Sequence, residues 1–366
     1  MFKAIHPKID EAHTLESLFY KDSGLFEQSK DKIFAKSWHW TASTDQLSTA
    51  GQTWPYTLLD GFLNEPLLIT RDQADQLHVL SNVCTHRGNI LVEHPCKLKK
   101  ILCNYHGRRF DLSGKFEFMP EFKDAKNFPT ACDDLPKVPW GLWADKFIFT
   151  SIEPAFPLES IIKPLQERLY FLDLTQLRFD STRSRDYLVQ SHWALYVDNY
   201  LEGLHIPFVH PGLNSILDYG TYQTEQFEYG NLQIGYGKTQ NDAFVLPKRH
   251  PDFGQNVAAY YYWFFPNLML NFYPWGLSVN VIRPLNTNLC KVSFLTYILD
   301  ETKLGIGAGA ELDKVEREDE AVVENVQRGI MSRFYQKGRY SPYKEQNLHQ
   351  FHSLIARFML ADFPKI

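Results

Sequence analysis

CTHRG at residues 84–88 and CNYHG at residues 103–107 are two short segments of the same design, and sixteen residues separate the histidine of the first from the cysteine of the second. Each segment offers one thiolate and one imidazole, and each ends in a glycine that permits a tight turn. Two thiolates and two imidazoles are the ligand set of a [2Fe–2S] cluster in which histidines replace the cysteines of one iron. The predicted cluster ligands are Cys84, His86, Cys103 and His106.

A structural zinc ion is the alternative for these four residues, because tetrahedral Zn²⁺ also binds two cysteines and two histidines. Zinc fingers usually pair a Cys-x₂₋₄-Cys segment with a His-x₃₋₅-His segment. Here each segment mixes the two residue types. The mixed order therefore favours the iron–sulfur cluster over zinc.

CTHRGN and CNYHGRRFDLSGKF resemble the two cluster loops of the Rieske non-haem iron oxygenases, the family of aromatic-ring-hydroxylating dioxygenases and related monooxygenases and demethylases. The resemblance implies a Rieske-type [2Fe–2S] cluster and the alpha, or catalytic, subunit of an oxygenase. One residue departs from the pattern. Members of the family often have Trp after the second His-Gly, where this chain has Arg108, and we assign that residue no role from the sequence.

Composition indicates a soluble enzyme. At 366 residues the chain is long enough for two domains with substantial cores. Its formal net charge of −5 gives no electrostatic basis for binding nucleic acid or a membrane surface. No apolar run approaches the ~20 residues that span a bilayer, and the N-terminus lacks the apolar region of a signal peptide. Five cysteines, two of them assigned to iron, are typical of a reducing compartment, so we expect a cytoplasmic protein.

The pattern of apolar residues changes twice along the chain. Residues 1–37 carry helical patterning and are expected to be N-terminal helices of the catalytic domain. Residues 38–151 contain short apolar strands separated by Gly, Asp and Asn, which predicts a small all-β domain with both cluster segments in its turns. Residues 152–366 alternate long helices with long strands. The resemblance implies an α+β fold in which the Rieske domain is inserted in a helix-grip catalytic domain, a curved antiparallel sheet over a long helix.

HWALYVDNYLEGLHIPFVHP at residues 192–211 is the second chemical centre. On a helical wheel its apolar residues form one stripe, and a polar group lies opposite. That polar group is Asp198, Glu202 and His205. A solvent-facing side would explain the carboxylates but not a further histidine, His210. Pro207 disfavours helical geometry just before it, so the helix should end or kink there and let His210 turn back towards His205.

Glu202-x-x-His205-x₄-His210 is similar to the mononuclear iron motif of the same family, with Glu where most members have Asp. The resemblance implies that His205 and His210 are metal ligands of a 2-His-1-carboxylate site, which suits non-haem Fe(II) and leaves positions open for O₂. It also implies a catalytic role for Glu202. This carboxylate would link His205 to the second cluster histidine of a neighbouring subunit in a head-to-tail ring, a homotrimer. The alternative is that Glu202 only orients His205 within one chain.

The third metal ligand must be a later carboxylate. An apolar stripe predicts a helix over about residues 311–330. The stripe consists of Leu312, Val315, Val322, Val323, Val326 and Ile330. Asp319 falls near its middle, whereas Glu318 and Glu320 lie off it, towards solvent. A buried carboxylate is costly unless it is paired or binds metal, and the family places its ligand Asp in a similar setting, so we expect Asp319 to be the ligand. The alternative is that a neighbouring Arg or Lys pairs with Asp319.

No NAD or flavin site is expected in this chain. Residues 305–310, GIGAGA, fit the G-x-G-x-x-G/A dinucleotide pattern, but the acidic segment after them would repel a pyrophosphate. A loop before a helix explains these glycines. Electrons would therefore come from a separate NAD(P)H-dependent reductase, a ferredoxin or both, and they would pass from the cluster to an Fe(II) that activates O₂.

Aromatic residues make up 15% of the chain, and several lie on the strands expected to form the pocket. The candidate substrate-binding residues are Trp263, Phe265, Tyr273 and Trp275. Core packing explains most such rings, but a cage of them could also bind a quaternary ammonium group by cation–π attraction. Residues 198–225 resemble choline and carnitine monooxygenase-like members of the family. We therefore expect a monooxygenase that hydroxylates or demethylates a small methylammonium compound. The alternatives are an arene dihydroxylating dioxygenase and, in another class, a Rieske electron carrier.

Overall fold

The computed structural model describes residues 2–210, 212, 223–238, 243–309 and 312–363. Parts of two sequence-based arguments lie outside these residues: positions 211 and 213–222 of the choline monooxygenase-like stretch, and position 310 of the glycine-rich segment with position 311 after it.

The chain divides into two compact units, one comprising 1–34 and 156–366 and the other 35–155. Sequence analysis placed the divisions after residues 37 and 151. Residues at the two ends of the second unit pair with each other, since Glu153 N–H donates to the Ala35 carbonyl and Ala155 N–H to that of Lys36.

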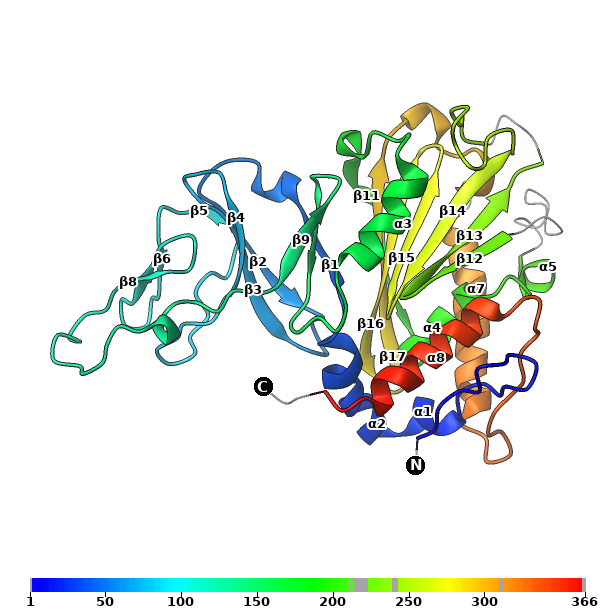
Figure 1. The fold of residues 1–366 in the computed structure, drawn as a ribbon, viewed down its shortest axis with the longest axis horizontal. Coiled ribbons are helices and arrows are strands. Elements are labelled where there is room, and N and C mark those ends of the chain that lie inside the picture. The colour runs from blue at the N-terminus through cyan, green and yellow to red at the C-terminus, as the bar shows by residue number, and fades with distance from the viewer. Residues whose placement is uncertain (1, 211, 213–222, 239–242, 310–311, 364–366) are drawn as a thin grey trace. The chain divides into compact units, whose positions relative to one another are not determined.

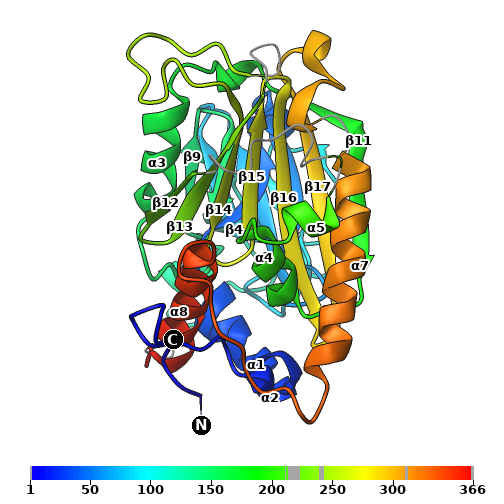
Figure 2. The ribbon, with the colours of Figure 1, turned by 90° about the vertical axis from the view of Figure 1, so that its right-hand side faces the viewer.

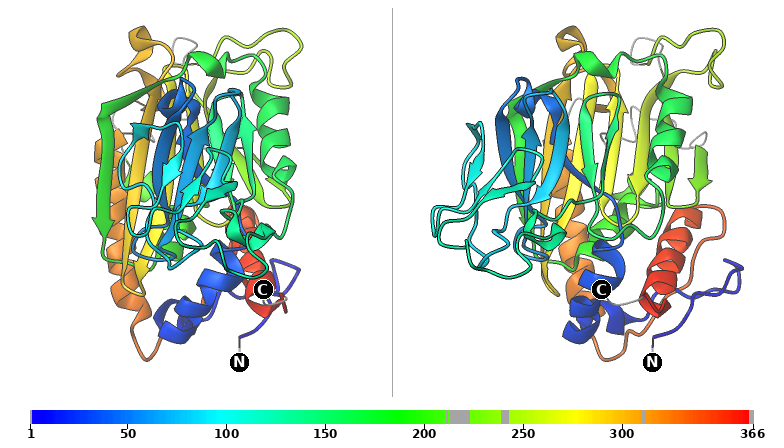
Figure 3. Two further views of the ribbon diagram at one scale, coloured as in Figure 1. Left: turned by 90° about the vertical axis from the view of Figure 1, so that its left-hand side faces the viewer. Right: turned by 60° about the vertical axis from the view of Figure 1, so that its left-hand side comes forward.

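The 35–155 unit is built of antiparallel strands in three small sheets, with orders β1-β10-β9, β4-β3-β2-β5 and β6-β7-β8 (Figure 1). Figure 3 shows this unit from two further sides, in blue to teal. The strands are β1 (His39–Ser43), β2 (Gln52–Leu58), β3 (Glu65–Arg71), β4 (Leu77–Ser81), β5 (Cys96–Lys97), β6 (Ile101–Leu102), β7 (Arg109–Phe110), β8 (Phe116–Phe118), β9 (Trp140–Trp143) and β10 (Phe147–Thr150). Two 3₁₀ helices, η2 (Thr44–Leu47) and η3 (Ala131–Asp133), complete it.

The two predicted cluster cysteines belong to the core of this unit. Cys84 and Cys103 pack with Leu68, Leu80 and Ile101, among other apolar side chains. Cys84 follows β4, and Cys103 follows β6 directly. The cluster loops are therefore anchored at strand ends, which limits their motion.

The larger unit contains a seven-stranded antiparallel sheet of order β11-β17-β16-β15-β14-β13-β12. Its strands are β11 (Arg178–Val189), β12 (Gln223–Phe227), β13 (Gly230–Tyr236), β14 (Val257–Phe264), β15 (Leu268–Tyr273), β16 (Gly276–Asn286) and β17 (Leu289–Ile298). Its helices are α1 (Ser17–Lys21), α2 (Ser23–Ser29), the π-helical η1 (Lys30–Phe34), α3 (Glu159–Leu169), α4 (Trp193–Tyr200), α5 (Ile206–Val209), α7 (Leu312–Ile330) and α8 (Gln346–Leu360). Short 3₁₀ turns are η4 (Leu174–Gln176), η7 (Glu301–Lys303) and η8 (Gly307–Gly309).

Strand β14 is apolar on both of its faces because side chains cover both sides of the sheet. Tyr262 and Phe264 stack on each other on one side, where the Tyr262 hydroxyl donates to the Pro164 carbonyl of α3. Helices α4, α5 and α7 lie on the other side, with α4 and α5 in front of β15 and β16 in Figure 2. A long helix against one face of a curved antiparallel sheet is the helix-grip arrangement that the family resemblance implied.

The inward face of α7 differs from the predicted stripe. Val323 and Ile330 are buried as expected, but Val326 is 42% exposed and Gln327 is only 5% exposed. Gln327 Oε1 accepts a hydrogen bond from the backbone N–H of His192 at 2.8 Å. This hydrogen bond to the residue before α4 holds Gln327 inward. The buried face of α7 is therefore rotated from the stripe that the apolar residues alone predict.

Within the described ranges, no helix is both long enough and apolar enough to span a lipid bilayer.

Candidate metal centres

The two cluster loops have matching backbone geometry. Gly88 and Gly107 have φ of +70° and +76°, in the left-handed region that glycine tolerates. The Gly88 N–H donates to the Cys84 carbonyl at 3.0 Å, and the Gly107 N–H donates to the Cys103 carbonyl at 2.9 Å. Each loop therefore closes on its own cysteine and presents the cysteine and histidine of one segment together.

The side chains of these loops suit a cluster of the predicted kind. Cys84 and Cys103 are free thiols, each 2% exposed. The rings of His86 and His106 lie 4.8 Å apart, and both Nδ1 atoms are buried without a hydrogen-bond partner in the part of the chain that the structure describes. Burial, and then the neighbouring His106, lower the pKa of His86, which favours the neutral imidazole that a metal requires. Unpartnered buried ring nitrogens are costly, and iron would satisfy both of them.

Helix α4 ends earlier than the proline predicts. It stops at Tyr200, and the Glu202 carboxylate accepts hydrogen bonds from the backbone N–H groups of Leu204 and His205. Pro207 lies in the first turn of α5, a position where proline is well tolerated. The expected break at Pro207 is therefore wrong in position: the side chain of Glu202 closes the turn between α4 and α5.

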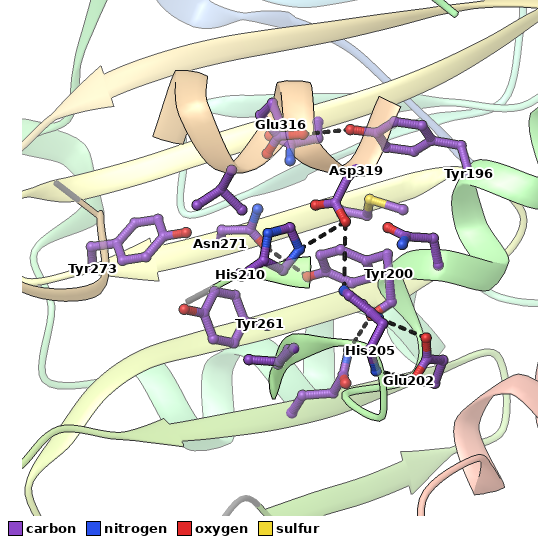
Figure 4. Close-up of a pocket in the computed structure, with 16 residues that line it drawn as sticks. Tyr196, Tyr200, Glu202, His205, His210, Tyr261, Asn271, Tyr273, Glu316 and Asp319 are labelled. Carbon is purple, nitrogen blue, oxygen red and sulfur yellow. Dashed lines mark hydrogen bonds and ion pairs between the residues drawn. The ribbon is translucent and has the colours of Figure 1, made fainter. Parts of the chain in front are cut away.

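His205, His210 and Asp319, here called the iron triad, converge on one point (Figure 4). Asp319 Oδ1 lies 2.9 Å from His210 Nε2 and 3.5 Å from His205 Nε2. One ligand atom from each residue lies within 4.8 Å of the others. Two imidazoles and one carboxylate on a single face form the donor set of a non-haem Fe(II) site, so these residues fit the predicted metal.

Both histidines of the triad are oriented by a second carboxylate. His205 Nδ1 lies 2.6 Å from Glu202 Oε1, and His210 Nδ1 lies 2.8 Å from Glu318 Oε2. Burial alone would lower the pKa of His210, but the carboxylates of Asp319 and Glu318 raise it. The resulting negative potential suits a cation.

A cavity opens beside the triad. Its wall includes four tyrosines, several amide side chains and a further carboxylate, Glu316 (Figure 4). The tyrosines are Tyr196, Tyr200, Tyr261 and Tyr273.

Comparison with known proteins decides the family. The profile for the catalytic domain of ring-hydroxylating alpha subunits matches residues 175–361, and the Rieske [2Fe–2S] profile matches residues 37–129. The chain belongs to the Rieske non-haem iron oxygenases. It is an oxygenase, with a Rieske domain for a [2Fe–2S] cluster and a catalytic domain of the kind that binds mononuclear iron in this family.

Several relatives of this Rieske oxygenase have defined names. The chloroplastic choline monooxygenase of Arabidopsis thaliana is 30% identical, with 95% of this chain and 84% of that protein covered. The carnitine monooxygenase oxygenase subunit of Escherichia coli (strain K12) is 28% identical, with 95% of this chain and 94% of that protein covered.

Solved structures share the fold. A quaternary ammonium Rieske monooxygenase, whose structure bears on carnitine oxidation and inter-subunit electron transfer, matches with a TM-score of 0.77 at 22% identity, covering 98% of this chain and 100% of that one. Naphthalene 1,2-dioxygenase from Rhodococcus sp. matches with a TM-score of 0.74 at 17% identity, covering 96% and 95% of the two chains.

The residue that replaces the usual Trp in this Rieske domain is buried. Arg108 is 2% exposed and forms an ion pair with Asp133 Oδ1 at 2.6 Å. Its guanidinium lies 4.8 Å from the centroid of the Phe116 ring. Hydrogen bonding to Thr130 and Arg108 outweighs burial and lowers the pKa of Asp133. Arg108 therefore ties the second cluster loop to η3 through a paired buried charge.

Two predictions about polar residues near the triad are wrong. Glu318 was expected to face solvent, but its carboxylate contacts His210, and its side chain is 28% exposed. Asp198 was grouped with Glu202 and His205, but it bonds to His352 and Tyr20 instead. The helical wheel assumed one regular helix through residue 205, whereas α4 ends at Tyr200. Asp198 on the helix therefore does not share a face with Glu202 and His205, which lie beyond its end.

Only one of the four expected pocket aromatics, Tyr273, lines the cavity. Trp263 lies further along β14, where it packs against Phe351 of α8 at 5.2 Å. Phe265, beyond the end of β14, packs against Phe358 at 4.8 Å. Trp275 stacks behind Tyr273, with ring centroids 5.2 Å apart.

Sequence analysis missed Tyr261 and Glu316 as lining residues. Strand periodicity could have found Tyr261, because it lies two residues before the candidate Trp263 on the same face of β14. Glu316 precedes Asp319 by three positions on α7, so it shares the helix face of the ligand.

Proposed function

We propose that this oxygenase uses electrons from a separate NAD(P)H-dependent reductase, a ferredoxin or both, together with O₂, to hydroxylate or oxidatively demethylate a small quaternary ammonium compound. The observation that supports this most is the cavity beside the iron triad, lined by tyrosines and by a carboxylate. The choline and carnitine monooxygenases to which this chain is similar are named for substrates of this kind.

In this proposal the iron triad would hold Fe(II), and the cluster would be held by Cys84, His86, Cys103 and His106. When bound, these groups would supply electron transfer at the cluster and O₂ activation at the mononuclear iron. The protein binds the substrate in the cavity and excludes bulk water from it. Glu202 and Glu318 keep the Nε2 atoms of the two histidines aimed at the metal by accepting hydrogen bonds from their Nδ1 atoms.

We further propose that Glu202 carries out its role between subunits, linking His205 with the partner subunit's His106 in a homotrimer. Two features support this. The Glu202 side chain is 15% exposed while it holds His205, and Tyr105, next to the second cluster histidine, is 59% exposed.

The five cysteines are all free, which agrees with a cytoplasmic location.

The cavity does not favour dihydroxylation of an arene. A neutral hydrocarbon would bring no positive charge to a wall that carries the carboxylates of Glu316, Glu202 and Asp319. An electron carrier without oxygenase activity would not need a second metal site. Iron analysis separates an oxygenase from an electron carrier, because an oxygenase binds mononuclear iron in addition to the two irons of a [2Fe–2S] cluster.

The decisive experiment measures O₂ uptake and product mass with the reduced, iron-loaded protein. Choline, L-carnitine, glycine betaine and naphthalene are offered in separate reactions. We expect uptake coupled to an oxidised product with at least one of the three ammonium compounds and none with naphthalene. Coupled turnover of naphthalene alone would refute the proposal.

A further inference from the structure

The wall of the cavity holds a carboxylate that is not needed to bind or orient the metal. Glu316 lines the cavity beside Asp319, but the donor set at the metal is complete without it, since two imidazoles and one carboxylate form that set. Its Oε2 accepts a hydrogen bond from the Tyr196 hydroxyl. Among the described residues, no Lys or Arg forms an ion pair with it.

We propose that Glu316 is a specificity-determining residue that binds the ammonium group of the substrate, and that the cavity selects a substituted ammonium compound with a neutral polar tail over one with a carboxylate. This inference rests on the proposed function and deepens it. It assigns the cation to a particular carboxylate and predicts a ranking among ammonium compounds.

The electrostatic state of Glu316 agrees with this role. Burial, and then the negative charge of Asp319, raise the pKa of Glu316 to about 8. The described part of the cavity wall therefore supplies too little positive charge to stabilise the ionised carboxylate. A bound ammonium group provides that charge in a site of low dielectric, where an ion pair is stronger than in water.

The tyrosines supply the remaining contacts of a cation site. Tyr261 and Tyr273 stand edge to face, with centroids 5.9 Å apart, and both line the cavity with Tyr196 and Tyr200. Ring faces attract a quaternary ammonium group, which has no N–H to donate and relies on such contacts. Aromatic rings around one carboxylate thus match a methylated cation better than a metal ion or a primary amine.

The same wall disfavours a carboxylate on the substrate. Among the described residues that line the cavity, none is Lys or Arg, and the histidines are those of the iron triad. A substrate carboxylate would face Glu316 and Glu202, and no Lys or Arg side chain of the described wall could pair with it, so like-charge repulsion opposes its binding. Amide side chains such as Asn199 and Asn271 can instead bond to a hydroxyl group.

The test compares a cation with its neutral carbon isostere. Dissociation constants for choline, 3,3-dimethylbutan-1-ol and L-carnitine are measured by calorimetry on the full chain with both metal sites filled. We expect the wild type to prefer choline over the neutral isostere by roughly 10- to 100-fold, as for a buried charge pair, and to bind L-carnitine more weakly than choline.

Glu316→Gln should remove most of the preference for choline over the isostere while iron content and the cluster spectrum stay unchanged. Glu316→Asp should keep part of it, because the charge is retained. Glu320→Gln is the matched control, an acid on the same helix that does not line the cavity. Tyr196→Phe removes the hydrogen bond but not the charge, so it should preserve the preference that Glu316→Gln loses.

The results distinguish failure of the inference from failure of the proposed function. If the wild type oxidises an ammonium compound but Glu316→Gln keeps the full preference for choline, the inference is wrong and the proposed function stands. If the wild type binds L-carnitine more tightly than choline, the ranking is wrong even if no variant folds. If the wild type binds none of the ammonium compounds, both the proposed function and the inference are overturned.

Discussion

Replacing Glu318 with alanine should weaken the mononuclear iron site, although Glu318 is not placed among the ligands. Its carboxylate lies 2.8 Å from His210 Nδ1, and the His210 side chain is only 1% exposed. The variant leaves a buried N–H without its acceptor and lets the imidazole rotate about the bond that aims Nε2 at the metal. Losing a hydrogen-bond partner of a metal-bound histidine typically costs roughly 10- to 100-fold in metal affinity, about 1.4–2.7 kcal/mol.

The structure places the expected loss near the lower end of that range. The Glu318 side chain is 28% exposed, so water can reach the vacated position and accept part of the hydrogen bond. We expect Fe(II) affinity to fall about 10-fold in Glu318→Ala and less in Glu318→Gln, which keeps an acceptor oxygen.

The assay is competition for Fe(II) against a chelator of known affinity, with the cluster monitored by its visible absorbance. Glu320→Ala is the control, because Glu320 lies on the same helix without a contact to either histidine, and it should bind iron as the wild type does. Wild-type iron affinity in Glu318→Ala, or an equal loss in Glu320→Ala, would show that the Glu318–His210 contact does not orient the ligand.

Four further outcomes follow from the same structure. Alanine at any position of the iron triad should abolish mononuclear iron binding, measured by metal analysis, while the cluster absorbance is retained; a variant that keeps the iron would remove that residue from the ligand set. Glu202→Gln should leave both metal sites filled yet slow re-oxidation of the reduced cluster by O₂ and substrate at least ~100-fold in stopped-flow absorbance if the carboxylate links the two histidines between subunits; unchanged re-oxidation would contradict the link. Burial lowers the pKa of His192 to about 3, so the unfolded chain binds more protons below pH ~6.5 and stability should fall by roughly 1.4 kcal/mol per pH unit below that point; urea unfolding between pH 5 and 7 should show this slope reduced in His192→Phe. Arg108→Gln should destabilise the 35–155 unit by about 2 kcal/mol, because it removes a charge-assisted hydrogen bond while Asp133 keeps its hydrogen bonds from Thr130, and urea titration of cluster absorbance measures the change.

Local patterns in the sequence predicted the two centres because their ligands are close together in the chain. Cys84 and His86 share one turn, and so do Cys103 and His106, so spacing alone brings each pair together. Asp319 is distant in sequence from the histidines, yet helical periodicity placed it on the inward face of α7. The structure brings it to the same point, because a buried carboxylate in an amphipathic helix needs a partner.

The sequence could not give the phase of polar residues beside that face. Glu318 sits one position from Asp319, about 100° around the helix, so it is equally free to face solvent or the end of a neighbouring loop. Only the path of the chain after α4 decides between these. That path depends on the Glu202 side chain closing the turn at Leu204, a local side-chain-to-backbone contact without a periodic signal.

Pocket residues were harder to predict because alternation along a strand selects a face but not a depth. Trp263 and Tyr261 point to the same side of β14, two residues apart. Tyr261 lines the cavity, whereas Trp263 lies under α8. Contact with α8 therefore places Trp263 outside the cavity, and the strand pattern does not predict where α8 packs.

The charges around the metal explain why a cationic substrate suits this cavity better than a neutral one. Asp319, Glu202 and Glu318 carry three formal negative charges when ionised, one more than the two positive charges of Fe(II). Glu316 adds a fourth carboxylate beside them, and its pKa is raised to about 8 partly by the charge of Asp319. A neutral ligand leaves this excess of negative charge in place and disfavours the ionised form of Glu316. An ammonium group offsets it and favours the ionised form, so proton release from Glu316 and binding of the cation are thermodynamically linked.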